Sequence, residues 1–300
     1  MRYTARAPLR IDFGGGWTDV PIYAEREGGA VLNAAITRYV TGMIARPETH
    51  GLLHALRGDR SYVSYQLDLP VGAGLGASAA QTVLWVTLVK TTIANVSERR
   101  DIAEIACQIG GLLGIMGGKQ DEYASALGGI TYYTFGDTVH AQHLNLDSSL
   151  ADELRSRLVL VYTGTPRMSG TIHERVWGRY ERAEPSVVGA LATLKRVAGD
   201  MRDALAARDL DAFADLLNEN WESQKALDTF ITNDRLDEIF DFAARHGARG
   251  GKACGAGGGG CAVFLAARGD EDRLREAFRS RKLQIVDFDF DTYGVFLSKR

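Results

Sequence analysis

A glycine-rich turn in the first third of the chain places the strongest constraint on the fold. Residues 62–69 alternate apolar and polar side chains, as a half-buried strand does, and Pro70 ends the pattern. Residues 72–76 contain three glycines and lead into a helix pattern that begins near Ser78, with Gln81 as its capping partner. A strand, a glycine turn and a helix N-terminus point several backbone N–H groups at one spot, which favours a bound phosphate.

Two other phosphate-binding patterns can be compared with this segment. The Walker pattern is absent, because the glycine-lysine pair that ends at Lys119 is followed by Gln120. The dinucleotide pattern is formally present as Gly72, Gly74 and Ala77, but no acidic residue follows about 20 positions later for a ribose. A dinucleotide-binding oxidoreductase stays an alternative, which NAD binding without ATP binding would favour.

The charge balance and the cysteines narrow the class of protein. The chain has 300 residues, with 35 Lys and Arg against 38 Asp and Glu, for a net charge of −3. This balance predicts no nucleic-acid or membrane partner. Cys107, Cys254 and Cys261 have neither disulfide nor zinc-site spacing, which fits a reducing compartment. No signal-peptide pattern or membrane-spanning apolar run is present, so a cytoplasmic protein is expected.

The rest of the chain shows strand and helix periods without a linker or a repeat. Apolar spacing predicts a strand over 36–44, helices over 101–113, 187–205, 210–221 and 234–245, and strands over 157–162, 262–266 and 285–290. The second half is therefore more helical than the first. The likeliest division is into two lobes that meet near residues 155–165.

Two further glycine-rich segments flank this arrangement. Residues 7–19 hold Gly14–Gly16 between two aspartates, and residues 252–261 hold four consecutive glycines before a strand pattern. The last segment alone could be a flexible turn, or a place where backbone approaches backbone or a ligand.

Taken together, the three segments resemble the GHMP kinases, which include galactokinase, homoserine kinase and mevalonate kinase. The segment from Pro70 to Ala80 is similar to the family's phosphate loop, with Ala77 in place of its first serine. The resemblance implies an α+β fold in two lobes. A ribosomal-protein-S5-like lobe would cover residues 1–158, and a ferredoxin-like lobe residues 159–300.

Within the family, residues 10–19, 118–121, 163–167 and 221–231 resemble sugar kinases that act on the anomeric hydroxyl, namely D-glycero-D-manno-heptose 7-phosphate kinase and fucokinase. The implied cofactors are ATP and Mg²⁺. Asp121 would accept the proton of the attacking hydroxyl, and Arg10 would hold Asp121 ionised and stabilise the transferring phosphoryl group. Ser78 would contact Mg²⁺. The residues implied to line the triphosphate are Pro70, Gly72, Ala73, Gly74, Leu75, Gly76, Ala77, Ser78 and Ala79.

The resemblance also implies the residues that bind the sugar. These are Asp12, Gly15, Gly16, Trp17, Thr18, Asp19, Lys119, Arg167, Gly257, Gly258 and Gly259. Arg167 is a candidate for a substrate phosphate, and Lys119 and Lys252 for other anions, with an exposed surface role as the alternative for all three.

Simpler interpretations exist for the central residues. From the residues alone, Asp121 is a helix-cap aspartate, Arg10 a solvated strand residue, Ser78 a plain N-cap and His173 part of a polar surface. Gly110 also departs from the family pattern, because many relatives carry a magnesium-binding glutamate at this place. Metal binding would then rest on Ser78, the nucleotide phosphates and water, or activity is weakened.

The resulting function is ATP-dependent phosphoryl transfer to a sugar or sugar-phosphate hydroxyl, with D-glycero-D-manno-heptose 7-phosphate as the first choice. The alternatives are a C7-cyclitol phosphate, an unphosphorylated sugar, or a non-catalytic relative that binds nucleotide or sugar. The sequence leaves the oligomeric state open, with a homodimer as the commonest arrangement.

Overall fold

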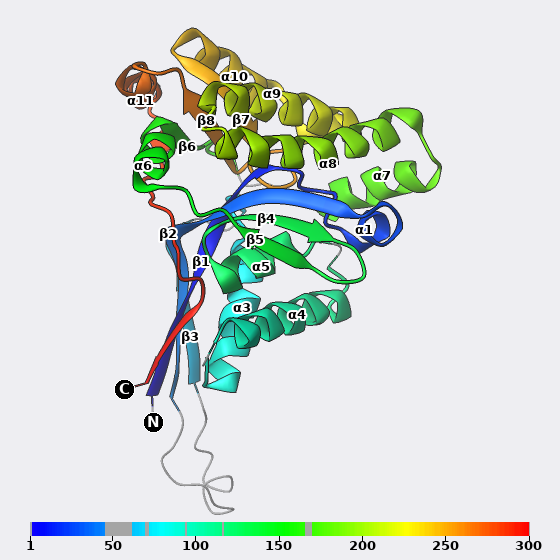
Figure 1. The fold of residues 1–300 in the computed structure, drawn as a ribbon, viewed down its shortest axis with the longest axis vertical. Coiled ribbons are helices and arrows are strands. Elements are labelled where there is room, and N and C mark those ends of the chain that lie inside the picture. The colour runs from blue at the N-terminus through cyan, green and yellow to red at the C-terminus, as the bar shows by residue number, and fades with distance from the viewer. Residues whose placement is uncertain are drawn as a thin grey trace, which may run out of the picture.

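A long antiparallel sheet organises the first part of the chain (Figure 1). The computed structural model describes residues 2–45, 62–69, 72–93, 95–115, 117–165 and 170–299. Within these residues, six strands pair in the order β10-β1-β2-β4-β5, and β3 pairs with β2 as well. Their bounds are β1 Arg2–Gly14, β2 Gly29–Ala45, β3 Tyr62–Leu67, β4 Ile130–Phe135, β5 His140–His143 and β10 Phe296–Lys299.

Strand β2 is long enough to serve two partners along one edge. Its first half, from Gly29 to Ala34, pairs with β4, and its second half, from Val40 to Ala45, pairs with β3. Its other edge pairs with β1. Because β3 stops at Leu67, the glycine turn that follows it passes beside the middle of the sheet.

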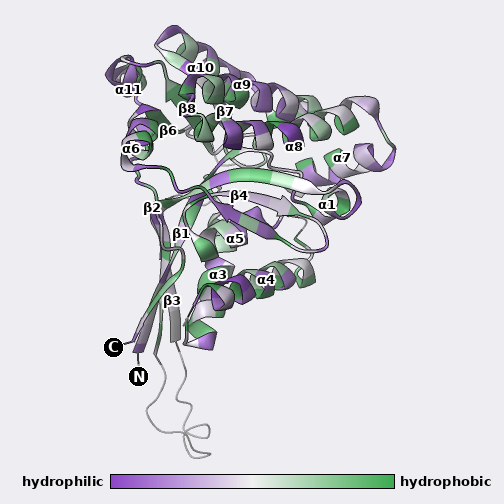
Figure 2. Cartoon of the chain, in the orientation of Figure 1, coloured by the Kyte–Doolittle hydropathy of each residue, from purple (hydrophilic) through white to green (hydrophobic). Residues whose placement is uncertain are grey.

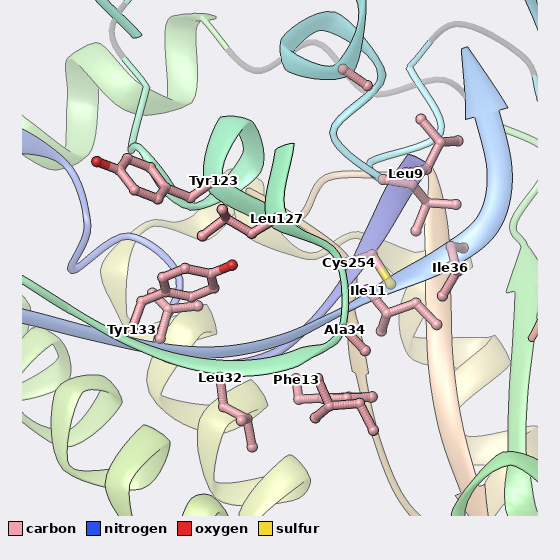
Figure 3. Close-up of a cluster of buried hydrophobic side chains, with 14 of the residues drawn as sticks. Leu9, Ile11, Phe13, Leu32, Ala34, Ile36, Tyr123, Leu127, Tyr133 and Cys254 are labelled. Atoms are coloured by element: carbon pink, nitrogen blue, oxygen red, sulfur yellow. The ribbon is translucent and has the colours of Figure 1, made fainter. Parts of the chain in front are cut away.

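Helices cover both faces of this sheet. On one face lie α3 (Ala77–Lys90), α4 (Val96–Leu112) and α5 (Gln120–Leu127), and on the other lie α8 (Pro185–Ala206) and α9 (Leu210–Leu227) (Figure 1). Figure 3 shows this separation: Leu32 and Phe13 lie on one side of the strands, and Tyr123 and Leu127 lie on the other. The rings of Phe13 and Phe213 meet edge to face at 5.4 Å, which ties β1 to α9.

A second, smaller antiparallel sheet has the order β7-β8-β6-β9. Its strands are β6 Leu158–Tyr162, β7 Ala248–Ala253, β8 Cys261–Ala266 and β9 Gln284–Ile285. Along β6, Leu158 and Leu160 join the large core shared with the first sheet, while Val159 and Val161 pack under α10 (Asp234–Arg245) and α11 (Glu271–Ser280). Alternate side chains of β6 therefore face opposite layers, as the two-residue period of a β-strand requires.

The remaining helices are short and lie at the edges. They are α1 (Pro21–Glu27), α6 (Ser148–Arg157), α7 (Gly170–Glu181) and the 3-10 turn η1 (Thr229–Ile231). Figure 2 shows hydrophilic residues on α6 and α11 at the edge of the molecule and hydrophobic residues along β2 in its centre. No helix among the described residues is long and apolar enough to cross a membrane.

The structure confirms most of the expected elements and corrects one. The strand expected over 285–290 ends at Ile285, because the chain there crosses between the sheets. Val286 N–H still donates to Leu160 of the second sheet, whereas Thr37 N–H of the first sheet donates to the carbonyl of Asp289. The chain then ends as β10 beside β1, so the last residues of the expected second lobe lie on the first sheet. The division at residues 158 and 159 stays a prediction.

Candidate active site

A buried ion pair joins the first strand to the short helix α5. Arg10 on β1 is 2 % exposed, and its Nε donates to Asp121 Oδ1 at 2.7 Å. Its second terminal nitrogen also lies 2.7 Å from that oxygen. Burial opposes the charge on Arg10, but Asp121 and Asp12 outweigh it and raise the pKa of the guanidinium. The interpretation of Arg10 as a solvated strand residue is therefore wrong.

The glycine turn packs directly on this pair. Arg10 donates a side-chain hydrogen bond to the carbonyl of Gly74 at 2.8 Å, and its backbone N–H donates to Leu75. Gly76 has φ 75°, and a Cβ added there would lie 3.3 Å from the Asp121 carboxylate and 3.4 Å from Arg10 Cγ. Glycine is needed at position 76 for both its backbone angle and its lack of a side chain.

Helix α3 begins in a way that exposes Ser78. The expected capping box is wrong: the N-cap is Gly76, no side chain caps the helix, and Ser78 lies in its first turn. Its side chain is exposed and borders a cavity together with Ala79 and Thr82. Gly76, whose backbone is in the left-handed conformation, ends the turn here. The hydroxyl of Ser78 is therefore not used as a helix cap and is available to a ligand.

Asp19 holds the N-terminus of α5 at the opposite wall of this cavity. Its Oδ2 accepts the backbone N–H of Gln120 at 3.0 Å. A Cβ at Gly118 would lie 1.8 Å from the same oxygen, so the carboxylate rests against bare backbone. Burial, opposed by this hydrogen bond and assisted by repulsion from Asp121 and Asp12, raises the pKa of Asp19 to about 7.

Asp12 lies deeper, under the cavity. Its Oδ2 is 2.7 Å from Lys252 Nζ on β7, and both side chains are almost completely buried. Gly16 lies over Asp12, because an added Cβ there would be 2.4 Å from Oδ2. Lys252 is thus neither a surface residue nor a cavity residue. It is the buried counter-ion of Asp12, and the pair links the two sheets.

An aromatic wall closes one side of the cavity. Trp17 adopts a left-handed backbone with φ 81° and stacks on His173 of α7, with ring centroids 4.4 Å apart. Trp177 Nε1 donates to His173 Nδ1 at 3.4 Å. The expectation that His173 is part of a polar surface is therefore wrong, since both Trp17 and His173 border the cavity.

Several predicted site residues hold the loops in place without lining the cavity. Thr18 donates its hydroxyl to the carbonyls of Gly15 and Ala30, and Gly15 N–H donates to Asn220. Leu75 is buried in the large core, so a contact to phosphate could come only from its backbone. The other loop residues that do not border the cavity are Gly72, Ala73, Gly74, Gly76 and Ala77.

The last glycine run packs against the glycine turn at Ala73. Cys261 N–H donates to the carbonyl of Ala73, and a Cβ on Gly260 would lie 2.7 Å from that oxygen. Gly257 and Gly258 pack on η1, where Gly258 N–H donates to Ile231. Gly257, Gly258 and Gly259 do not border the cavity, whereas Gly255 and Ala256 of the same loop do.

The predicted residues that border the cavity are Arg10, Asp12, Gly16, Trp17, Asp19, Ser78, Ala79 and Asp121. The cavity residues that sequence reasoning missed include His173, Thr82, Gln120 and Glu122. Burial and repulsion from Asp121 raise the pKa of Glu122 to about 8. The adjacency of Glu122 to Asp121 was the one signal that could have drawn attention to it.

Three other residues complete the account of the predicted site. Lys119 pairs with Glu104 at 3.4 Å and borders a neighbouring hollow instead of the main cavity. Pro70 and Arg167 lie outside the described residues.

Comparison with known proteins places this site in a family. Residues 38–129 match the model of the GHMP kinases N terminal domain, and residues 201–283 match that of GHMP kinases C terminal. Together these segments make up more than half of the chain. The chain belongs to the GHMP kinase family. Its α+β fold in two lobes and its ATP-dependent kinase activity on sugars follow from this membership and from its kinase relatives.

Two curated relatives extend the comparison over the whole chain. D-glycero-alpha-D-manno-heptose 7-phosphate kinase of Campylobacter jejuni is 28 % identical, and the match covers 97 % of each chain. The bifunctional fucokinase/GDP-fucose pyrophosphorylase of Arabidopsis thaliana is 27 % identical over 98 % of this chain, which spans 32 % of that larger protein.

Solved structures of other GHMP kinases share the fold. A D-glycero-D-manno-heptose 1-phosphate kinase from Bacteroides thetaiotaomicron has a TM-score of 0.76 and 24 % identity, and the match covers 99 % of both chains. A Lactococcus lactis galactokinase complexed with galactose has a TM-score of 0.74 and 17 % identity, with coverage of 99 % and 95 %.

Gly76→Ala should separate the geometry of the ion pair from general stability. The new Cβ would push on Asp121 and Arg10, so kcat should fall about tenfold or more. Gly269→Ala is the matched control, because Gly269 also has a left-handed φ, of 88°, but no atom lies within 4 Å of its added Cβ. Both variants should lose stability to a left-handed alanine, and equal kcat values for the two would contradict the argument.

Asp19→Asn should change the pH dependence of stability. An unfolded aspartate loses its proton near pH 4, whereas Asp19 in the folded protein keeps it until about pH 7. Wild type therefore loses the contribution of Asp19 to stability between these pH values, and the variant has no such contribution to lose. The unfolding free energy of Asp19→Asn should exceed that of wild type by near zero at pH 4 and by on the order of 2–4 kcal/mol above pH 7. Denaturant titration against the exposed Asp137→Asn checks this, and a pH-independent difference would contradict it.

Proposed function

We propose that this sugar kinase transfers the γ-phosphoryl group of ATP to the anomeric hydroxyl of D-glycero-D-manno-heptose 7-phosphate. The observation that carries the chemistry is the Arg10–Asp121 pair at the border of the cavity, beside the first turn of α3. The choice of sugar is supported by the Campylobacter jejuni relative, a D-glycero-alpha-D-manno-heptose 7-phosphate kinase matched over 97 % of each chain.

Each residue has a defined task in this reaction. Asp121 accepts the proton of the attacking hydroxyl as the new O–P bond forms and the bond to the leaving ADP oxygen breaks. Arg10 holds the Asp121 carboxylate in place through their ion pair and stabilises negative charge on the transferring group. The first turn of α3 offers backbone N–H groups and its dipole to the phosphates.

Magnesium fits this site as a partner of the nucleotide. Among the described residues, no group of three or more His, Cys, Asp or Glu could hold an ion alone. The exposed Ser78 hydroxyl and a buried, unpartnered oxygen of Glu122 do border the cavity. Mg²⁺ usually takes one or two protein oxygens and completes its octahedron with phosphates and water. An ion bound jointly by these two residues and the nucleotide phosphates therefore fits the site. Bound there, it would neutralise charge on the β- and γ-phosphates.

The sugar would lie between the aromatic wall and the carboxylates. Rings such as Trp17 pack on the apolar face of a sugar, while Asp19 and Asp121 can accept its hydroxyls. A homodimer is the proposed assembly, as the commonest symmetric arrangement.

An unphosphorylated sugar is the second candidate substrate. Among the described cavity residues, Arg10 is the permanently charged cation, and it is already paired with Asp121. A substrate phosphate would then depend on Arg167, outside the described residues. A substrate without a phosphate needs no such contact.

A substrate panel with an Asp121→Asn control tests the function. The protein is incubated with ATP, Mg²⁺ and a set of sugars, sugar phosphates and cyclitols, and ADP release is followed. Heptose 7-phosphate should give the highest kcat/KM, and the variant should lose about 10²–10⁴-fold in kcat because the general base is gone. The variant should still bind ATP, and Asp101→Asn, an exposed position on α4, should retain activity. Full turnover by Asp121→Asn would refute the role of Asp121, and turnover of another panel member alone would refute the heptose.

His173→Phe should test the aromatic wall. Phenylalanine keeps a ring to stack on Trp17 but removes both ring nitrogens from the cavity. The KM for the sugar should rise about tenfold, the cost of one lost hydrogen bond, while the KM for ATP stays unchanged. His140→Phe, at an exposed position on β5, is the control. A rise in the KM for ATP alone would place His173 on the nucleotide side instead.

A further inference from the structure

Among the described residues, Glu122 differs from the other carboxylates of the cavity in having neither a counter-ion nor a hydrogen bond from another residue. Four acidic residues border the cavity: Asp12, Asp19, Asp121 and Glu122. Asp12 pairs with Lys252, Asp121 pairs with Arg10, and Asp19 accepts the backbone N–H of Gln120. Glu122 Oε2 is buried and accepts no hydrogen bond in the part of the chain that the structure describes. A buried carboxylate oxygen without a partner is costly unless a ligand compensates it.

The surroundings of Glu122 leave room for such a ligand. Glu122 and Gly110 of α4 border the main cavity and also the neighbouring hollow lined by Pro21, Cys107 and Lys119. Among the described residues, no atom outside the surrounding helix backbone lies within 4 Å of the position that a Cβ on Gly110 would occupy. Helix α4 therefore presents bare backbone at this border, and the acidic group comes from α5.

The ligand should be a hard cation. Lys119, the nearest lysine in sequence, is engaged with Glu104 across the neighbouring hollow. Ser78 supplies a second oxygen at the border of the same cavity, at the helix end proposed for the phosphates. An anionic carboxylate, a hydroxyl and phosphate oxygens are the donors that Mg²⁺ prefers.

We propose that Glu122 is the carboxylate ligand of the magnesium ion that accompanies ATP, acting together with the hydroxyl of Ser78. The ion compensates the charge of Glu122 and of the nucleotide at once, so metal and nucleotide bind cooperatively. The absence of a side chain at Gly110 is then no obstacle to metal binding. This inference rests on the kinase activity and not on the identity of the sugar.

The test measures nucleotide binding without any sugar, so it fails or succeeds independently of the proposed substrate. The dissociation constant of the non-hydrolysable analogue AMP-PNP is measured by calorimetry with and without Mg²⁺. The increase in AMP-PNP affinity that Mg²⁺ causes is compared for wild type, Glu122→Asp, Glu122→Gln and the control Asp101→Asn, at an exposed position. We expect the increase in AMP-PNP affinity caused by Mg²⁺ to be at least tenfold smaller in Glu122→Gln than in wild type, and to be reduced by less in Glu122→Asp. Asp101→Asn should behave as wild type, and metal-free binding should not weaken in any variant.

Two results would overturn the proposal. One is an unchanged effect of Mg²⁺ in both Glu122 variants. The other is an equal loss of AMP-PNP binding with and without the ion, which would make Glu122 a structural or nucleotide-contacting residue. Mn²⁺ binding in the presence of AMP-PNP, followed by electron paramagnetic resonance, gives a second readout. The Mn²⁺ dissociation constant should rise in Glu122→Gln, and an unchanged value would count against the proposal.

Discussion

The buried guanidinium of Arg10 is the interaction on which the architecture of the site depends. It contacts three stretches of chain that are far apart in sequence: β1, which carries it, the glycine turn through Gly74, and α5 through Asp121. Removing either charge would leave the other buried without a partner, at a cost of about 3–5 kcal/mol. The groups that we propose for the chemistry are therefore the same groups that fix the turn against the helix, and the sheet supports both.

The close approaches around this pair explain why glycines gather in three separate segments. Gly76 lets the turn touch Asp121, Gly118 lets Asp19 reach the N-terminus of α5, and Gly260 lets the last glycine run contact Ala73. At Gly118 and Gly260 a carboxylate or a backbone oxygen occupies the space that a Cβ would need, and at Gly76 an added Cβ would be tight against the carboxylate of Asp121. The segments are spread over the sequence because the site is assembled where two sheets and their crossing loops meet.

The sequence predicted those elements whose own period carries the signal. Helices α8 and α10 and strands β6 and β8 were predicted within a few residues, because their apolar side chains repeat along one or both faces. The return of the chain end to β1 could not be predicted, since pairing between residues 3 and 299 leaves no local pattern.

The same distinction applies to the site. The family pattern implied Arg10, Asp121 and Ser78, and the structure brings them to one cavity. The family pattern could not reveal that the Thr18 hydroxyl is hydrogen-bonded to backbone carbonyls or that Lys252 is buried beneath Asp12. It also could not reveal that α7 places His173 against Trp17. These facts depend on contacts between segments more than ten residues apart, or on which face of a turn a side chain takes.

The charge balance of the cavity sets a requirement for nucleotide binding. The pairs Arg10–Asp121 and Lys252–Asp12 cancel internally, which leaves Asp19 and Glu122 facing a polyanionic triphosphate. Burial raises the pKa of Asp19 to about 7 and that of Glu122 to about 8, so near neutral pH both carboxyl groups are in part protonated and repel the phosphates less. The dipole of α3 offsets only part of the remaining repulsion, because its effect is equivalent to about half a charge. For the proposed nucleotide, a site built this way favours binding together with a cation, because the cation balances the negative charge that Asp19 and Glu122 retain.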